Sequence, residues 1–209
     1  MAQAISKFVS TAWADPVLVQ LAAFKTKIGW FGVVHVGPVL FGLKFGFATR
    51  RELVSQFTDS LDRSGRSEWV SPRIETAFDG FSKSKEAWQQ LLVDYSAGKK
   101  VSFSRVELND SGRTKFQSSV LRACRQIPYG STLSYGALAA KSGSPNAARA
   151  VGSTMKSNRF PIIIPCHRVV ASTGVGGFSG VGGTSTKRRL LGIEGYFDDS
   201  LLPDLAERR

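Results

Sequence analysis

Residues 161–170 read Pro-Ile-Ile-Ile-Pro-Cys-His-Arg-Val-Val, and this stretch decides how the C-terminal half of the chain is interpreted. Three β-branched residues between two prolines lead into an apolar interior, and the apolar run resumes after Arg168. Buried polar side chains need hydrogen-bond partners, so Cys166, His167 and Arg168 in succession indicate a reactive centre at a rigid bend. The alternative is a plain core strand with a structural cysteine and an arginine that reaches solvent.

The length and composition indicate a globular protein. The 209 residues can bury a core as one large or two small domains, and 42% of them are hydrophobic. Cys124 and Cys166, the two cysteines, lie in segments of different character, which argues against a disulfide and favours a reducing compartment. No apolar run approaches the roughly 20 residues that span a bilayer, and residues 1–25 lack a secretory layout. We therefore expect a cytoplasmic location, or a nuclear one in a eukaryote, and no membrane partner.

The positive charge of the chain is concentrated in one segment. The net charge is +12, and twelve of the 28 lysines and arginines lie between Arg113 and Gly195 together with a single acid, Glu194. Such a segment is typical of a nucleic-acid-binding module. The alternative is a solvated basic surface, although such surfaces usually mix both signs of charge.

The first half of the chain predicts a small α+β domain over residues 1–108, with residues 1–25 as a loosely attached extension. Alternating aromatic, β-branched and glycine residues predict strands, among which His35 packs without a functional role. Apolar residues at helical spacing predict helices. The domain ends in the loop that begins at Asn109. The predicted elements are two or three antiparallel strands within 28–47, helices over 49–62 and 84–97, and a strand over 101–108.

After this loop the apolar spacing becomes helical. A first helix is predicted by one apolar face, which consists of Phe116, Val120, Cys124 and Ile127. Cys124 acts on this face as a small apolar filler. Ser134 is placed to cap a second helix over residues 135–141, and Ser144-Pro145 predicts the start of a third helix that runs to about Ser157.

These segments together predict an α+β protein. A small N-terminal sheet-plus-helix domain is followed by a mostly helical C-terminal domain that contains a helix-turn-helix. We expect this second domain over residues 113–195 and a C-terminal tail over residues 196–209.

Three motifs resemble the O6-alkylguanine-DNA alkyltransferase, or methylated-DNA–protein-cysteine methyltransferase, family. They are Ile164-Pro-Cys-His-Arg-Val-Val, Asn146-Ala-Ala-Arg-Ala-Val-Gly and Ser134-Tyr-Gly. The resemblance covers residues 113–195, and the first half is similar only in its α+β pattern. It implies irreversible, stoichiometric transfer of a methyl or larger alkyl group from O6-alkylguanine in flipped-out duplex DNA to Cys166, and it leaves O4-alkylthymine open.

The chemistry of the central residues agrees with this resemblance. A thiol with an ordinary pKa of about 8.5 must be activated before it attacks an alkyl carbon at neutral pH, and His167 is the nearest base in sequence. The resemblance implies that a water links Cys166 to His167 and that Glu194 holds the other imidazole nitrogen, in the manner of a catalytic triad. The alternative for Glu194 is a surface acid at a helix end.

Further site residues follow from the same resemblance. Tyr135 matches the tyrosine that donates to the flipped base, with core packing as its alternative. Arg149 matches the arginine that fills the gap left by the base, with an ordinary phosphate contact as its alternative. By the same resemblance, Asn158 braces the turn before Cys166 and Ser179 lies in the pocket loop. Ala147, Ala148 and Gly152 lie on the helix that meets DNA. Arg168 and Lys187 are each either a phosphate contact or a structural or pocket residue.

The implied partner is the minor groove of double-stranded DNA that contains O6-alkylguanine, bound by a monomer. No cofactor is implied. We also predict no metal, because the N-terminal half contains no cysteine and one histidine.

Three other interpretations of the function are considered against this one. A non-enzymatic protein could bind alkylated bases, although relatives of that kind replace the cysteine. A helix-turn-helix regulator would need base-reading side chains and a further domain, and a cysteine hydrolase leaves the basic segment unexplained.

Overall fold

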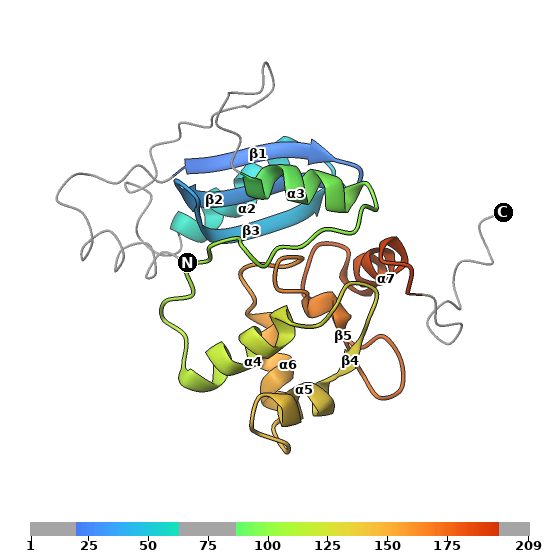
Figure 1. Ribbon diagram of the computed structural model, residues 1–209. Helices are drawn as coiled ribbons and strands as arrows, with labels where there is room; N and C mark the ends of the chain where they lie inside the picture. The colour runs from blue at the N-terminus through green and yellow to red at the C-terminus, as the bar shows by residue number, and fades with distance from the viewer. Residues whose placement is uncertain (1–19, 63–86, 197–209) are drawn as a thin grey trace. The chain divides into compact units, whose positions relative to one another are not determined.

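The computed structural model of the chain describes residues 20–62 and 87–196. The chain divides into two compact units, the first ending at Gly112 and the second beginning at Arg113 (Figure 1). The first unit combines a sheet with helices and the second is mostly helical, which confirms the predicted α+β class. Residues 1–19 of the predicted extension and residues 197–209 of the predicted tail lie outside the described residues.

The first unit is built on an antiparallel meander with the strand order β1-β2-β3. Phe31 lies opposite Phe24 on one side and opposite Phe45 on the other, with ring centroids 5.6 and 5.3 Å apart. This row of aromatic rings fixes the register, because a slip of one residue would turn the rings to the other face. The strands are β1 (Gln20–Thr26), β2 (Gly29–Val36) and β3 (Val39–Phe47).

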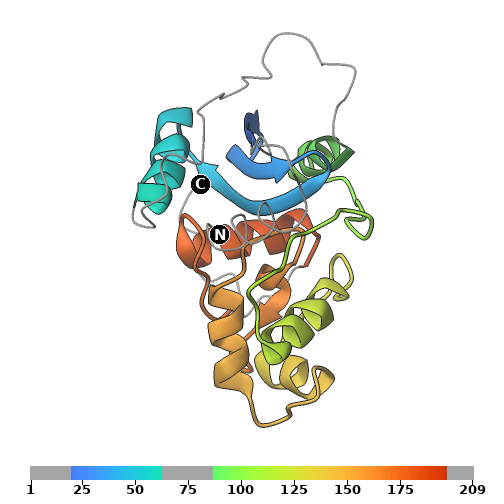
Figure 2. The same cartoon turned by 90° about the vertical axis from the view of Figure 1, so that its left-hand side faces the viewer.

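Two helices, α2 (Arg50–Asp62) and α3 (Ala87–Ser96), cover opposite faces of this sheet (Figure 2). The side chain of Phe57 packs so closely on Gly32 that a Cβ atom there would lie 2.5 Å from its ring. On the other face, Trp88 packs edge-on against the buried His35, whose Nδ1 lies 3.0 Å from the carbonyl oxygen of Gly37. His35 is thus part of the core, as predicted.

The structure corrects two predictions in this unit. Residues 20–25 belong to β1 and are not part of a loose extension, because Leu21 and Phe24 are buried in the core. Residues 101–108 do not form a strand, although Leu108 makes an isolated bridge to Leu40. A turn between Phe103 and Val106 interrupts their alternation and lets both side chains point inward.

The second unit packs three helices around an apolar centre. Thr114 and Gln117 form a capping box at the start of the first, and Ser134 caps the second by accepting a hydrogen bond from the amide of Ala137, as predicted. A turn joins the second and third helices in the predicted helix-turn-helix arrangement. The helices are α4 (Lys115–Arg125), α5 (Tyr135–Lys141) and α6 (Ala148–Lys156), followed later by α7 (Gly183–Ile193).

The start of α6 differs from the prediction. Ser144-Pro145 opens a turn, in which the amide of Ala147 donates to the carbonyl oxygen of Ser144, and the helix begins at Ala148. Ala147 at the N-cap offers no side-chain acceptor, so the amides of the first turn of α6 are left available to other groups.

Residues 161–168 form a bend and not a strand. Ile162 adopts a left-handed conformation with φ of 73°, and Cys166–Arg168 form a 3₁₀ turn named η2. Only after it does the chain become extended, in β5 (Val169–Val170), which pairs with β4 (Leu133–Ser134) in parallel. Pro161 and Pro165 explain why no ladder forms, since neither can donate a backbone hydrogen bond.

Candidate active site

Helix α7 brings a cation and an anion to the cysteine turn. Lys187 and Glu194 are seven residues apart, or about two helical turns, and therefore share one side of the helix. Lys187 contacts the backbone just after the turn, and Glu194, at the C-cap, contacts the turn itself. The two side chains thus hold the three residues that follow Cys166.

The first contact of Glu194 is with the imidazole of His167. Nε2 of His167 lies 2.7 Å from Oε1 of Glu194, and neither side chain is exposed to solvent. Burial alone would raise the pKa of Glu194, but hydrogen bonds from His167 and Arg168 outweigh it and lower the pKa to about 2. Because the carboxylate can only accept, Nε2 carries the proton and Nδ1 is the nitrogen able to receive another.

Arg168 binds the same carboxylate as a fork. Its Nε donates to Oε2 of Glu194 over 2.8 Å and its Nη2 donates to Oε1 over 2.9 Å. Its Nη1 donates to the carbonyl oxygen of Ile127 over 2.6 Å, and its guanidinium lies 5.8 Å from the ring centroid of Tyr129. Only 7% of the residue is exposed and its donors bind within the protein, which favours the structural alternative for Arg168 over a phosphate contact.

Cys166 lies at the wall of a cavity, with 8% of its surface exposed. Burial raises the pKa of the thiol, and a hydrogen bond from Asn158 and the charge of Lys187 partly oppose that rise. The Asn158 amide also donates to the carbonyl oxygen of Ile164 over 2.8 Å and accepts from the amide of Phe160 over 3.0 Å. Asn158 therefore braces the bend that presents the thiol.

The cavity has a volume of about 310 Å³, within the range of small-molecule sites. Its walls come from α5, α6, the cysteine turn and the glycine-rich loop before α7. It combines apolar surface with a thiol, a phenol and a serine hydroxyl, the mixture of apolar walls and a few polar groups that is typical of small-molecule sites. The lining residues are Tyr135, Gly152, Met155, Lys156, Cys166, Gly177, Phe178 and Ser179.

Two predicted residues connect the walls of this cavity. The hydroxyl of Tyr135 lies 3.5 Å from the carbonyl oxygen of Gly177, at the limit of a hydrogen bond, and burial raises the pKa of this phenol. Ser179 donates to the carbonyl oxygen of Lys156 over 3.3 Å and so ties the loop to the end of α6.

Lys187 is buried, which favours the predicted alternative of a residue near the pocket over a phosphate contact. Its Nζ donates to the carbonyl oxygens of Val169, over 2.5 Å, and Gly177, over 3.2 Å, and lies 5.7 Å from the ring centroid of Tyr135. Burial lowers the pKa of this amine to about 8, while the charge of Cys166 acts in the opposite direction. Lys187 thus links β5, the glycine-rich loop and α5.

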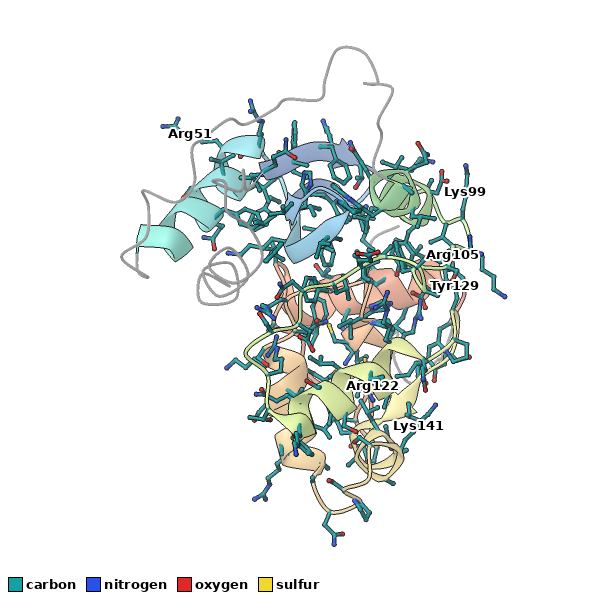
Figure 3. All side chains as sticks on the ribbon, turned by 60° about the vertical axis from the view of Figure 1, so that its left-hand side comes forward. Arg51, Lys99, Arg105, Arg122, Tyr129 and Lys141 are labelled. Carbon is teal, nitrogen blue, oxygen red and sulfur yellow. The ribbon has the colours of Figure 1, made fainter. Side chains whose placement is uncertain are left out.

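The predicted DNA-facing residues lie on α6. Arg149, Gly152 and Lys156 follow one another at helical spacing, and the last two line the cavity, which places the exposed Arg149 on the same face near the cavity mouth. Ala147 and Ala148 are half-buried at the start of the helix. Away from this face, the exposed Arg122 and Lys141 extend from α4 and α5 (Figure 3).

Several residues of the site escape prediction from the sequence. The amide of Gly130 donates to Oε2 of Glu194 over 3.1 Å, and a backbone donor carries no side-chain signal. Met155 reads as a core residue of α6, and its place on the cavity wall depends on the loop. Phe178 could have been found, because it is a large apolar residue in a loop that consists mostly of glycine.

The described residues contain no group of three or more histidine, cysteine or acidic side chains placed to hold a metal ion. Within the same ranges, no helix has the length and apolar character needed to cross a membrane.

Comparisons with known proteins agree with this geometry. The family profile described as 6-O-methylguanine DNA methyltransferase, DNA binding domain, matches residues 115–196. The constitutive methylated-DNA–protein-cysteine methyltransferase of Bacillus subtilis is 46% identical over 107 residues, which are 51% of this chain and 63% of that protein. A methylated-DNA–protein-cysteine methyltransferase of Mycolicibacterium paratuberculosis is 44% identical over 129 residues, covering 60% of this chain and 76% of the relative.

A solved structure extends the similarity to both units. The crystal structure of the Mycobacterium tuberculosis O6-methylguanine methyltransferase matches with a TM-score of 0.61 and 33% identity, over 90% of this chain and 98% of that one. The alignment with curated relatives is shorter and covers 63% of the Bacillus subtilis protein and 60% of the Salmonella typhimurium one.

The fold and the site thus define a two-unit protein in which a helix-turn-helix unit carries a buried cysteine, histidine and glutamate beside a cavity. The chain belongs to the methylated-DNA–protein-cysteine methyltransferase family.

Proposed function

We propose that this protein repairs DNA by direct reversal, moving the alkyl group of O6-alkylguanine onto Sγ of Cys166. The observation that carries the proposal is the placement of Cys166 at a cavity wall, next to a histidine that a buried carboxylate orients. Such an arrangement suits activation of a nucleophile by a neighbouring base.

In the proposed reaction, the thiol proton of Cys166 passes through a bridging water to Nδ1 of His167. Sγ then forms a bond to the alkyl carbon as the bond from that carbon to O6 of guanine breaks. Glu194 stabilises the imidazolium that results. The hydroxyl of Tyr135 donates a hydrogen bond to the guanine anion as its charge develops, and a raised pKa keeps this phenol protonated for that task.

The product is a thioether, which water does not readily cleave, so each molecule acts once. The flipped base would occupy the cavity, α6 would enter the minor groove, and Arg149 would fill the space that the base leaves. Base flipping costs a few kcal/mol, part of which such a side chain can offset. We expect a monomer that works where chromosomal DNA is held, in the cytoplasm or in a eukaryotic nucleus.

The proposal is tested by incubating the protein with a duplex containing one O6-methylguanine and measuring its intact mass. The mass should rise by one methylene unit in the wild type and in Cys124→Ser, but not in Cys166→Ser. Cys124 is the matched control, because it is the other buried free cysteine of the same unit. An unchanged wild-type mass with normal binding of the damaged duplex would favour the non-enzymatic alternative.

A further inference from the structure

The carboxylate of Glu194 is shared among four donors. Oε1 accepts from His167 and from Nη2 of Arg168, and Oε2 accepts from Nε of Arg168 and from the amide of Gly130. A carboxylate offers about four lone-pair sites, so this arrangement uses its capacity. Two of the four donors belong to one guanidinium, which therefore sets the plane and position of the group that holds the imidazole.

The same fork balances charge beside the imidazole. A carboxylate alone, 2.7 Å from a buried imidazole, would favour the protonated ring. An imidazolium cannot accept the proton of a thiol. The guanidinium group of arginine is charged in proteins. That of Arg168 touches both oxygens of Glu194, so His167 faces an ion pair in place of a bare anion.

We propose that Arg168 is a positioning residue of the site: by pairing with both oxygens of Glu194 it keeps His167 neutral at rest and therefore able to accept a proton. The inference rests on the proposed function for its purpose. Its geometry is independent of that function, since every contact lies within the second unit.

Other groups face His167 as well. Burial lowers the pKa of its imidazole, the hydrogen bond and charge of Glu194 raise it, and the charges of Arg168 and Lys187 lower it. These directions agree with a neutral resting imidazole. The ionisable groups around His167 and Glu194 are Lys187 of α7, Cys166 and Arg168 of η2, Cys124 of α4, Tyr129 before β4, and Tyr135 of α5.

The chain offers a direct measurement, because it contains only two histidines, His35 and His167. Protein labelled with ¹⁵N-histidine would show two sets of ring signals, from which the tautomer and the titration midpoint of each ring are read. We expect the wild-type His167 to carry its proton on Nε2 at neutral pH. The midpoint of His35, in the other unit, should be the same in every variant and serves as the internal control.

Arg168→Met removes the charge and the fork while it keeps an unbranched side chain. The midpoint of His167 should rise by about one pH unit or more, because the buried carboxylate then acts alone. Arg168→Lys keeps the charge, and its midpoint should stay close to that of the wild type. An unchanged midpoint in a folded Arg168→Met variant would overturn the inference.

The double variant Arg168→Met, Glu194→Gln removes both charges and keeps the result decisive if Arg168→Met fails to fold. Neutral replacement of a whole buried ion pair is often tolerated, whereas removal of one partner is not. Because the charge of Arg168 lowers the pKa of His167, the midpoint of His167 should be higher in this double variant than in Glu194→Gln, which keeps the arginine. Equal midpoints in the two variants would refute the charge balance, and they are what a purely structural role for Arg168 predicts.

The titration needs no alkylated DNA, so its outcome is separate from the mass test. A wild type that fails to gain mass but shows the expected midpoints would refute the proposed function and leave the role of Arg168 intact. The reverse result would leave the function intact and refute the role.

Discussion

The two histidines of the chain are both buried, yet the two units surround them differently. In the first unit, His35 contacts a tryptophan ring and a backbone carbonyl. In the second, His167 contacts a carboxylate that an arginine also binds. His35 is a core residue, whereas His167 is part of a hydrogen-bonded cluster with the charged side chains of Glu194 and Arg168.

The difference extends to the cores themselves. Among the residues that the structure describes, the buried polar side chains of the first unit besides His35 are Ser96 and Asn109, which carry no charge. The second unit buries Arg168, Lys187 and Glu194. Burying an ion costs several kcal/mol, which its partners offset only in part. A cluster of buried ions is therefore weak evidence for stability and a better sign of function.

The largest effect that separates the two histidines is expected from their replacement by glutamine. His167→Gln should slow alkyl transfer about 10²- to 10⁴-fold, the usual contribution of a general base. His35→Gln should leave the rate unchanged and lower the melting temperature of the first unit. Single-turnover kinetics with a fluorescent O6-benzylguanine and thermal unfolding measure the two effects, and equal rate losses would contradict the comparison.

The next effect concerns the buried amine. Lys187→Met keeps the length of the side chain but removes the donor to Val169 and Gly177, so the thiol and the cavity wall lose their common support. Misplacement of reacting groups by about 1 Å can cost roughly 100-fold, and we expect a loss of about 10- to 100-fold. Lys99→Met in the first unit is the control, since Lys99 is exposed and pairs only with a surface aspartate among the contacts described. A wild-type rate in Lys187→Met would show that the amine has no positioning role.

A smaller effect is expected from the exposed charges of the second unit. Arg149→Ala should slow repair of duplex DNA by about tenfold, because the side chain offsets only part of the flipping cost. Its rate with free O6-benzylguanine should not change. Arg122→Ala, on another helix, should alter only the salt dependence of binding. The role of Arg149 is refuted if both substrates slow equally.

The smallest effect is a pH dependence of stability. The folded pKa of Glu194 is lowered from 4.5 to about 2, so its stabilisation is complete above pH 4.5 and is lost as the pH falls toward 2. The amide protection factors of residues 113–196, which are corrected for the intrinsic exchange rate at each pH, should therefore fall over this range in the wild type, with less pH dependence in Glu194→Gln. Tryptophan fluorescence reports on the first unit, because residues 13, 30, 69 and 88 are the four tryptophans. If it changes first on acidification, the first unit is the more acid-sensitive of the two and the prediction is wrong.

The sequence predicts the elements better than it predicts burial. The helix over 49–62 and the cap at Ser134 follow from local spacing and are found nearly as expected. Glu194 could be singled out because it is the lone acid of a basic segment, and the structure brings it to His167. In contrast, Lys187 stands beside two arginines in the sequence, and nothing local distinguishes a buried amine from an exposed one.

Other misses depend on contacts between distant segments. Ser144-Pro145 has the composition of a helix start, but the turn that joins α5 to α6 uses those residues instead. The left-handed Ile162 has no sequence signature, because β-branched residues rarely adopt that conformation. The fork of Arg168 requires a carboxylate 26 residues further on, a pairing that no local rule supplies.

Helix α7 fixes the distance between two side chains that contact the residues after Cys166, and this limits how the chain can evolve. Its two turns between Lys187 and Glu194 fix a spacing of about 10 Å, so an insertion there would move one contact away from the cysteine turn. The glycine-rich loop before the helix supplies Gly177, Phe178 and Ser179 to the cavity, and Gly177 and Ser179 make hydrogen bonds that tie this loop to the helices. Under the proposed function, a change at Phe178 would therefore alter which substrates fit the cavity, while the contacts of Lys187 and Glu194 with the residues after Cys166 stay the same.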